Sequence, residues 1–378
     1  MEGFQKTFGI LPTVQAEAPG RIEFLGNHVD YNGGPVLGAT LDRTVRVAVA
    51  PRDDRRIVLA SAELPHRVET SVDRLHRRTG DESWANYLLG VVAVFQESGM
   101  RCGHGFSLWV ESDLPVGAGL SSSAALELAT AHALAKLYAW PIKKERMVAL
   151  CRKAENDFVG VPCGILDQGV IGFGEKHHLV HIDCRNERFS VVPFPPEGRF
   201  WIFNTQRKHN LLESCYAERA AECRQAFAIL RASSPDLGCL AEATTDDLTR
   251  DRHALGEVNW LRARHVVEEC ARVREAVDAL QRGDLTRVGK LLYASHESSR
   301  ILFQNSIPEL DFLVTQLSHQ SGVLGARLTG GGFGGAVMAL TREDFGSAHA
   351  EVIQRRFAEE FGGLPLQVFP AQTSAGAR

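Results

Sequence analysis

The sequence of 378 residues predicts an α+β fold in two domains, because strand-like and helix-like segments are mixed in both halves of the chain. The length suits two domains of ordinary size, and a hydrophobic content of 44% is enough for a sizeable core. A proline-rich stretch at Pro193–Gly198 lies between two strand-like segments. We therefore expect an N-terminal domain at 1–195 and a C-terminal domain at 196–378.

The elements of the N-terminal half follow from their residue patterns. Ala18–Phe24 leads into a turn-rich stretch at Gly26–Gly34. Alternating or β-branched runs predict short strands at Thr44–Ala50, Ile57–Ala60, Arg67–Thr70, Gly105–Glu111 and Leu179–Asp183. Apolar residues spaced three and four apart, with suitable helix starts, predict helices at Trp84–Ser98, Ser122–Tyr138 and Lys143–Asn156.

The C-terminal half begins with a strand-like run at Phe200–Asn204. From Leu212 to about Leu317 the chain is mostly helical and rich in Arg, Glu and Ala. Gly322–Gly335 has the composition of a loop, and Ala336–Leu340 predicts a short strand. No internal repeat or low-complexity segment interrupts this order, and the hydrophobic content disfavours a disordered chain.

Charge and cysteine content narrow the class of protein. The net charge is −4, from 42 basic and 46 acidic residues, which offers no general attraction to nucleic acid or to an anionic membrane. The eight cysteines show neither C-x-x-C nor a zinc-like Cys/His spacing, so we expect free thiols in a reducing cytoplasm. Met1–Gln15 lacks the pattern of a signal peptide, and no apolar run is long enough to span a bilayer.

The segment Leu114–Glu127, with the sequence LPVGAGLSSSAALE, predicts a phosphate-binding loop. A strand precedes it and a helix follows, so the helix start offers free N–H groups and a positive dipole end to an anion. Gly117 and Gly119 allow close approach of the backbone, and the serine hydroxyls suit phosphate oxygens or Mg²⁺. An ordinary serine-capped helix is the alternative. The chain has neither a Walker A loop nor a G-x-S-x-G elbow.

A second glycine cluster, Gly330–Gly335, formally contains G-x-G-x-x-G. A strand-like run follows it and little chain remains, so a dinucleotide-binding fold, and with it a dehydrogenase, is disfavoured. Five glycines in six residues indicate close approach of the backbone to a ligand or to another loop. A flexible surface loop is the alternative.

Two further segments carry polar chemistry. Gly20–Gly34 gathers Arg21, Asn27, His28, Asp30 and Asn32, a set of donors and acceptors that suits a polyol. In Glu155–Gln168, two acids twelve positions apart, Glu155 and Asp167, lie on either side of a glycine-containing turn. A kinase needs one carboxylate near Mg²⁺ and another at the substrate hydroxyl, although spacing alone makes this a weak signal.

In this order, the segments resemble the galactokinase branch of the GHMP kinase superfamily, from about Ala18 to Leu340. The resemblance rests on the sugar-binding signature in 18–42, the ATP loop in 114–127, CGILDQ at 163–168, RARHVVE at 262–268 and the third motif at 328–335. It implies an N-terminal domain like domain 2 of ribosomal protein S5, a ferredoxin-like C-terminal domain, and an active site in the cleft between them. It also implies ATP, Mg²⁺ and a small sugar as ligands of a monomeric cytoplasmic enzyme that binds no nucleic acid or membrane.

The resemblance also implies roles for individual residues. Asp167 would act on the anomeric hydroxyl as base or orienting partner, with Arg21 keeping it ionised and stabilising the transferred phosphoryl group. The implied sugar ligands are Asn27, His28, Asp30, Gly164 and Tyr216. The implied ATP ligands are Trp84, Tyr87, Gly117, Gly119, Leu120, Ser121, Ser122 and Ser123, and the implied metal ligands are Ser123 and Glu155. The third motif would contribute Gly331, Gly332 and Gly334. By periodicity alone, Trp84 and Tyr87 would be helix core.

Two positions depart from the family pattern. Asn27 stands where galactokinases usually carry a glutamate that accepts from a hydroxyl at the far end of the sugar, and Glu23 stands where they often carry Asn. The implied reaction converts ATP and galactose, or a close relative, to ADP and the α-sugar 1-phosphate. A kinase for an arabinose, a uronic acid or an N-acetylhexosamine remains open, as does a catalytically silent galactose sensor. The complete run Ser121–Ala125 and the presence of Asp167 favour catalysis.

Overall fold

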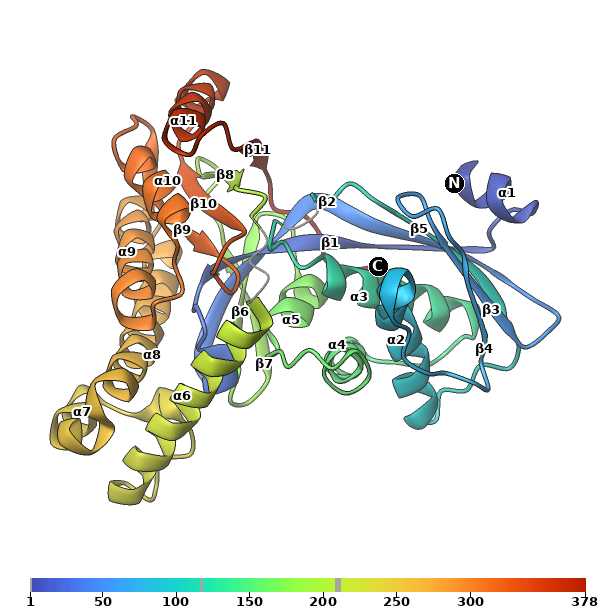
Figure 1. Ribbon diagram of the computed structural model, residues 1–378, viewed down its shortest axis with the longest axis horizontal. Coiled ribbons are helices and arrows are strands. Elements are labelled where there is room, and N and C mark those ends of the chain that lie inside the picture. The colour runs from blue at the N-terminus through green and yellow to red at the C-terminus, as the bar shows by residue number, and fades with distance from the viewer. Residues whose placement is uncertain (1, 116–117, 208–211) are drawn as a thin grey trace.

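The computed structural model describes residues 2–115, 118–207 and 212–378 (Figure 1). Within these residues the strands form a seven-stranded sheet and a four-stranded sheet. In the first sheet the order is β4-β3-β5-β2-β6-β7, with β1 paired to β2, and in the second it is β11-β8-β10-β9. The predicted mixture of helices and strands in both halves is confirmed.

The seven-stranded sheet is built on a long antiparallel pair. Its strands are β1 (Val14–Leu25), β2 (Pro35–Pro51), β3 (Arg56–Ser61), β4 (Val68–Ser71), β5 (Phe106–Ser112), β6 (His178–Asp183) and β7 (Arg188–Pro193). The strand predicted at Thr44–Ala50 is only part of the 17-residue β2. Strand β2 pairs with β1 at Leu37–Thr40 and again at Thr44–Val49. The short polar stretch at Asp42 and Arg43 between these segments therefore does not end the strand.

Helices α2 (Asn86–Glu97), α3 (Ser122–Leu137), α4 (Lys144–Lys153) and α5 (Leu166–Phe173) lie together on one side of this sheet (Figure 1). Helix α3 is central, because it contacts β1, β2, α2, α4 and α5. Its many buried alanines allow these neighbours to approach closely. Helix α1 (Glu2–Phe8) inserts Phe4 against Trp109 and Ala48 of the sheet. The 3₁₀ turns are η1 (Asp30–Asn32), η2 (Gly80–Ala85) and η4 (Leu240–Glu242), and η3 (Ala154–Val159) and η5 (Ser299–Phe303) are π-helical.

The four-stranded sheet carries most of the remaining helices. Its strands are β8 (Arg199–Asn204), β9 (Val323–Thr329), β10 (Ala336–Thr341) and β11 (Gln367–Ala371). The helices are α6 (Leu212–Ser233), α7 (Thr245–Arg250), α8 (Arg252–Gln281), α9 (Leu285–Ser298), α10 (Pro308–Ser318) and α11 (Ser347–Glu360). The prediction of a loop over the whole of Gly322–Gly335 is wrong, because β9 occupies half of this segment. A side chain at Gly325 would collide with the backbone at Gly289, so this glycine serves helix–strand packing rather than a turn.

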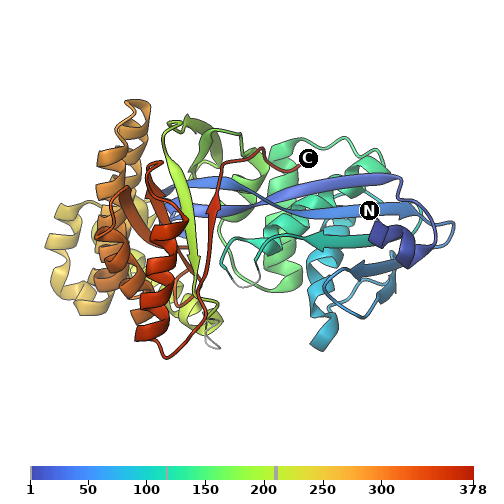
Figure 2. The same ribbon diagram turned by 90° about the horizontal axis from the view of Figure 1, so that it is seen from above.

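The two halves are joined by more than one connection. Strands β1 and β2 extend from the N-terminal half towards the C-terminal helices (Figure 2). The chain end returns to the first sheet, where Leu41 bridges Thr373 and the Glu17 N–H donates to the Arg378 carbonyl at 3.0 Å. The division at 195/196 stays a prediction. No helix among the described residues has the length and apolar character needed to cross a bilayer.

Candidate active site

One pocket gathers residues from most of the segments singled out in the sequence. It has a volume of about 290 Å³, close to the lower end of the range for small-molecule sites, about 300 Å³. It lies between the end of β1, the loop before α5, the start of α6 and the third motif. Its lining includes Arg21, Glu23, Asn27, His28, Asp30, Glu155, Cys163, Gly164, Asp167, Tyr216 and Gly331.

Asp167 is held in this pocket by two partners. Arg21 donates to Asp167 Oδ1 from Nε at 2.9 Å and from Nη2 at 2.6 Å, and Ser121 Oγ donates to Oδ2. The Arg21 side chain is buried, whereas that of Asp167 is 27% exposed. Asp167 lies in the first turn of α5 rather than in a loop. The predicted proximity of Arg21 and Asp167 is therefore confirmed. Part of the Asp167 carboxylate remains exposed to the pocket.

The serine loop joins this site from the other side. The Arg21 N–H donates to the Leu120 carbonyl at 3.0 Å, and Arg21 Nη1 donates to the Gly119 carbonyl at 2.7 Å. Ser121 has a left-handed backbone, with φ 56°, immediately before α3, and Ser122 at the first position of α3 is exposed. The first N–H groups of α3, which have no partner within the helix, therefore lie beside this site, as an anion site requires. Gly117 lies outside the described residues.

Glu155 and Ser123 form the candidate metal site. Glu155 is buried in the π-helical turn η3, and its Oε2 accepts from Gln168 Nε2 at 2.6 Å. Burial, followed by the charge of Asp167, raises the pKa of Glu155, while hydrogen bonding from Ser123 and Gln168 opposes that shift. No cluster of three or more metal-binding side chains occurs in the described part of the chain. A hydroxyl and one carboxylate nevertheless suit Mg²⁺, which takes its other ligands from water and phosphate.

The sequence reasoning missed Glu127 and underused Gln168. Both are fully buried, and Gln168 Nε2 bridges Glu127 Oε2 at 3.1 Å and Glu155 Oε2. Burial and the charge of Glu155 raise the pKa of Glu127 well above its usual range. Helix periodicity could have flagged Glu127, because it is a charged residue on the buried side of α3.

Asp30 and Gly164 meet in the wall of the pocket. A side chain at Gly164 would collide with Asp30 Oδ2, so glycine is required for this approach. Burial, together with the charges of Glu23 and Asp167, raises the pKa of Asp30 to about 7. The Tyr216 ring is tilted against the His28 ring, with ring centroids 5.0 Å apart, and also lines the pocket.

His28 connects the first motif to the third. Its Nδ1 lies 2.9 Å from the Tyr31 hydroxyl and its Nε2 lies 2.9 Å from the Gly331 carbonyl. Since a carbonyl only accepts, Nε2 carries the proton and Nδ1 accepts from Tyr31. Burial lowers the pKa of His28 to about 3, which keeps the ring neutral. Both ring nitrogens are therefore occupied by protein groups.

The glycines of the third motif serve close approach between loops. A Cβ at Gly330 would lie 3.3 Å from the Gly119 carbonyl, and one at Gly332, where φ is 79°, would collide with the Asn305 carbonyl. At Gly334, with φ 140°, a Cβ would lie 2.6 Å from the Arg207 carbonyl. Gly331 accepts from His28 and from Asn305. The third motif thus lies in contact with both the serine loop, at Gly119, and the first motif, at His28.

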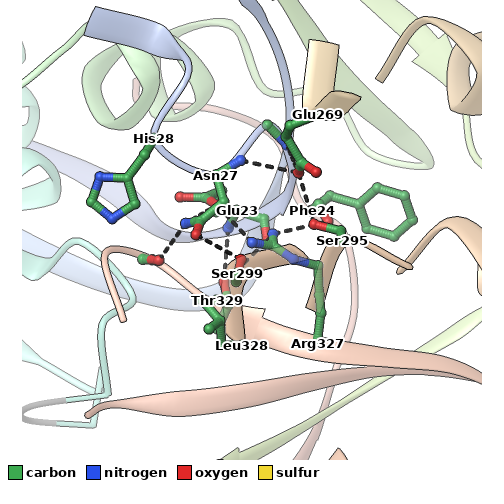
Figure 3. A network of polar contacts seen from close by, with 12 residues as sticks. Glu23, Phe24, Asn27, His28, Glu269, Ser295, Ser299, Arg327, Leu328 and Thr329 are labelled. Atoms are coloured by element: carbon green, nitrogen blue, oxygen red, sulfur yellow. Dashed lines mark hydrogen bonds and ion pairs between the residues drawn. The ribbon is translucent and has the colours of Figure 1, made fainter. Parts of the chain in front are cut away.

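Asn27 is completely buried in a polar network beside the pocket (Figure 3). Its backbone carbonyl accepts from His265 Nε2 at 2.9 Å, and its N–H donates to Glu269 Oε1 at 3.2 Å. Burial alone would raise the pKa of Glu269, but the charges of Arg272 and Arg327 hold it below its usual range. His265, in the RARHVVE segment of α8, thus fixes the backbone of Asn27.

Trp84 and Tyr87 lie outside this pocket. Trp84 belongs to η2 and is partly buried against the main core, and Tyr87 lies in the first turn of α2. Helix α2 packs beside α3, which begins at the serine loop. The contact of these two residues with ATP, which the family resemblance implies, stays a prediction.

Comparisons with known proteins agree with this geometry. Three family models match: the galactokinase galactose-binding signature at residues 2–51, the GHMP kinases N terminal domain at 86–175, and GHMP kinases C terminal at 276–362. A galactokinase of Roseiflexus sp. (strain RS-1) is 40% identical over 339 residues, covering 90% of this chain and 86% of its own. A galactokinase of Thermotoga maritima is 38% identical, covering 92% and 95%.

Solved structures give the same picture. The Lactococcus lactis galactokinase complexed with galactose superposes with a TM-score of 0.95 and 35% identity, covering 100% of this chain and 98% of that one. The Methanococcus jannaschii mevalonate kinase has a TM-score of 0.65 at 19% identity, which is a likeness of fold. The expected two-domain GHMP kinase architecture is confirmed by these matches.

Proposed function

Since the chain belongs to the galactokinases of the GHMP kinase superfamily, we propose that it transfers the γ-phosphoryl group of ATP to the anomeric hydroxyl of galactose. The proposal rests on the position of the Asp167 carboxylate. This carboxylate is fixed by Arg21 and Ser121 at the junction of the serine loop and the sugar-side pocket. Any hydroxyl held there meets a base on one side and a phosphate-binding helix start on the other.

In the proposed reaction, the anomeric hydroxyl donates its proton to Asp167 as its oxygen bonds to the γ-phosphorus. The bond between that phosphorus and the β–γ bridging oxygen breaks, and ADP leaves. Arg21, which donates to Asp167 Oδ1, fixes the carboxylate and places positive charge beside the transferred group. The start of α3 opposes the charge of the phosphate chain.

Ser123 and Glu155 are the proposed ligands of Mg²⁺, with Gln168 orienting the carboxylate. When bound, the ion neutralises charge on the β- and γ-phosphate oxygens. Asp30, Gly164 and Tyr216 are the proposed sugar contacts, because they line the pocket beyond Asp167. His28 shapes this wall through its ring, since its nitrogens are already paired.

We also propose that the enzyme works as a cytoplasmic monomer on small molecules alone. All eight cysteines are free, as expected for a reducing compartment. Sedimentation analysis of the purified chain with and without Mg²⁺-ATP tests the monomer.

The direct test of function is ADP release with a panel of free sugars: galactose, glucose, arabinose, galacturonate and N-acetylgalactosamine. Galactose should give the highest kcat/KM, and 1-deoxygalactose should give no ADP. Preference for another sugar by tenfold or more would reassign the substrate. Galactose binding without ADP release would indicate the silent sensor instead.

A further inference from the structure

The side chain of Asn27 has no hydrogen-bonding capacity left for a ligand. Nδ2 donates to Glu23 Oε1 at 2.8 Å and to the Gly330 carbonyl at 2.9 Å. Oδ1 accepts from Ser299 Oγ at 3.0 Å and from Asn305 Nδ2 at 2.8 Å. An amide has two donors and two acceptor lone pairs, so all four are used. The carboxylate and the carbonyl only accept, which fixes the orientation of the amide.

Glu23, in contrast, accepts hydrogen bonds from the described residues through only one of its two carboxylate oxygens. Oε1 accepts from Asn27 and from Arg327 Nη2, the latter at 3.0 Å. No hydrogen bond to Oε2 is found among the described residues, and the side chain is 7% exposed in the pocket wall. In Figure 3, Glu23 and Asn27 lie together between His28 and Arg327.

The position of Glu23 along β1 matches one end of a bound sugar. Arg21 and Glu23 are two residues apart on the same strand, so their side chains leave the same face about 6.6 Å from each other. Arg21 lies at the end of the pocket where the proposed phosphoryl transfer takes place, because it donates to Asp167. A pyranose ring between them would place its anomeric hydroxyl at Asp167 and its far hydroxyls at Glu23.

Glu23 is also held rigidly. Its N–H donates to Thr329 Oγ1 at 3.0 Å, and its carbonyl accepts from Arg327 Nη1 at 3.1 Å. Burial raises the pKa of Glu23, while Arg327 and Arg21 oppose this shift. A hydroxyl donating to Oε2 would satisfy the second oxygen and favour the charged form.

We propose that Glu23 is the specificity-determining residue for the sugar, with Oε2 accepting from a hydroxyl remote from the anomeric carbon, and that Asn27 is a positioning residue. The inference rests on the proposed sugar kinase activity. It also accounts for both departures in the first motif, since the carboxylate and the amide have exchanged places at positions 23 and 27. The site retains its acidic group, so the substitution at Asn27 does not weaken the case for galactose.

The test compares wild type with Glu23→Gln on galactose and its 2-, 3-, 4- and 6-deoxy analogues. Wild type should lose about 10- to 150-fold in kcat/KM with the 4- or 6-deoxy sugar, the value of one hydrogen bond to a charged group. Glu23→Gln should lose a similar factor on galactose, mainly through the KM for sugar. It should no longer distinguish galactose from that one analogue, while the KM for ATP stays unchanged.

Further variants keep the test decisive if Glu23→Gln does not fold. Glu23→Asp retains the charge opposite Arg327 and shortens the reach, so it should show the same selective loss. Asn27→Glu alone should reduce activity, because it places a second carboxylate against Glu23. The exchange Glu23→Asn with Asn27→Glu should recover at least tenfold of that loss.

The outcomes separate this inference from the proposed function. If wild type turns over no galactose, the proposed function fails. If wild type turns over galactose but Glu23→Gln and Glu23→Asp discriminate against every deoxy sugar as wild type does, the role of Glu23 is wrong. An Asn27→Glu variant faster than wild type on galactose would also overturn it.

Discussion

Replacing Asp167 by Asn should abolish most turnover while leaving the site intact. The amide oxygen of Asn can accept from Arg21 as Oδ1 does, and its NH₂ can donate to the Ser121 hydroxyl in place of Oδ2. The geometry is therefore preserved and only the proton acceptor is removed. Losing a general base costs about 10²- to 10⁴-fold in rate. That equals about 2.7–5.4 kcal/mol of transition-state stabilisation.

The assay measures kcat for ADP release with saturating galactose, and ATP affinity by calorimetry. Asp167→Asn should lower kcat by at least 100-fold with ATP affinity within threefold of wild type. Ser121→Ala is the matched control, since it keeps the carboxylate and deletes one donor to it. Its loss should be about tenfold, as expected for one hydrogen bond to a charged group. An Asp167→Asn variant within tenfold of the wild-type kcat would refute the assignment of Asp167.

Three other predictions concern the metal, the sugar and the core. Ser123→Ala should raise the Mg²⁺ concentration for half-maximal activity by at least about tenfold, because loss of even an outer-shell partner of a metal costs about 10- to 100-fold in affinity. An unchanged Mg²⁺ titration would remove Ser123 from the metal site. Ionised Asp30 accepts more strongly from sugar hydroxyls than its protonated form does, so the KM for galactose should rise as pH falls below about 7, and Asp30→Asn should lose this dependence. A KM that is flat from about pH 5.5 to 8 would contradict this prediction. The raised pKa of Glu127 contributes stability that is present below the usual value of 4.5 and is lost as pH rises. The free energy of unfolding of Glu127→Gln, measured in urea, should therefore rise relative to that of wild type by up to about 1.4 kcal/mol for each pH unit above 4.5. If the free energies of variant and wild type changed with pH in parallel, the assignment of Glu127 as a buried acid would be contradicted.

The sequence predicted the elements whose patterns are local. Helix α3 was expected at Ser122–Tyr138 and ends one residue earlier. It was predictable because its alanine-rich body favours a helix through local propensity, without help from distant parts of the chain. Strand β9 was missed because the composition of Gly322–Gly335 as a whole suggested a loop. Only the tertiary packing of Gly325 on Gly289 shows why that glycine lies in a strand. The glycines at 330–335 were correctly attributed to close approach, although their partners were unknown.

Within the candidate site, the sequence located the reacting end better than the sugar end. Arg21 and Asp167 are 146 positions apart and were brought together only through the family resemblance, which the structure bears out. The interpretation of Asn27 as a sugar ligand ignored its surroundings, because Ser299, Asn305 and Gly330 lie far away in sequence. Long-range hydrogen bonds of this kind leave no local pattern.

The most direct test of the central claim is the identity of the product. The purified chain is incubated with Mg²⁺-ATP and galactose, and the quenched mixture is analysed by phosphorus and proton NMR. We predict one new phosphomonoester whose phosphorus couples to the anomeric proton of an α-galactose unit, formed in a one-to-one ratio with ADP. A phosphomonoester coupled to the C6 protons, or ADP formed without any sugar phosphate, would contradict the account.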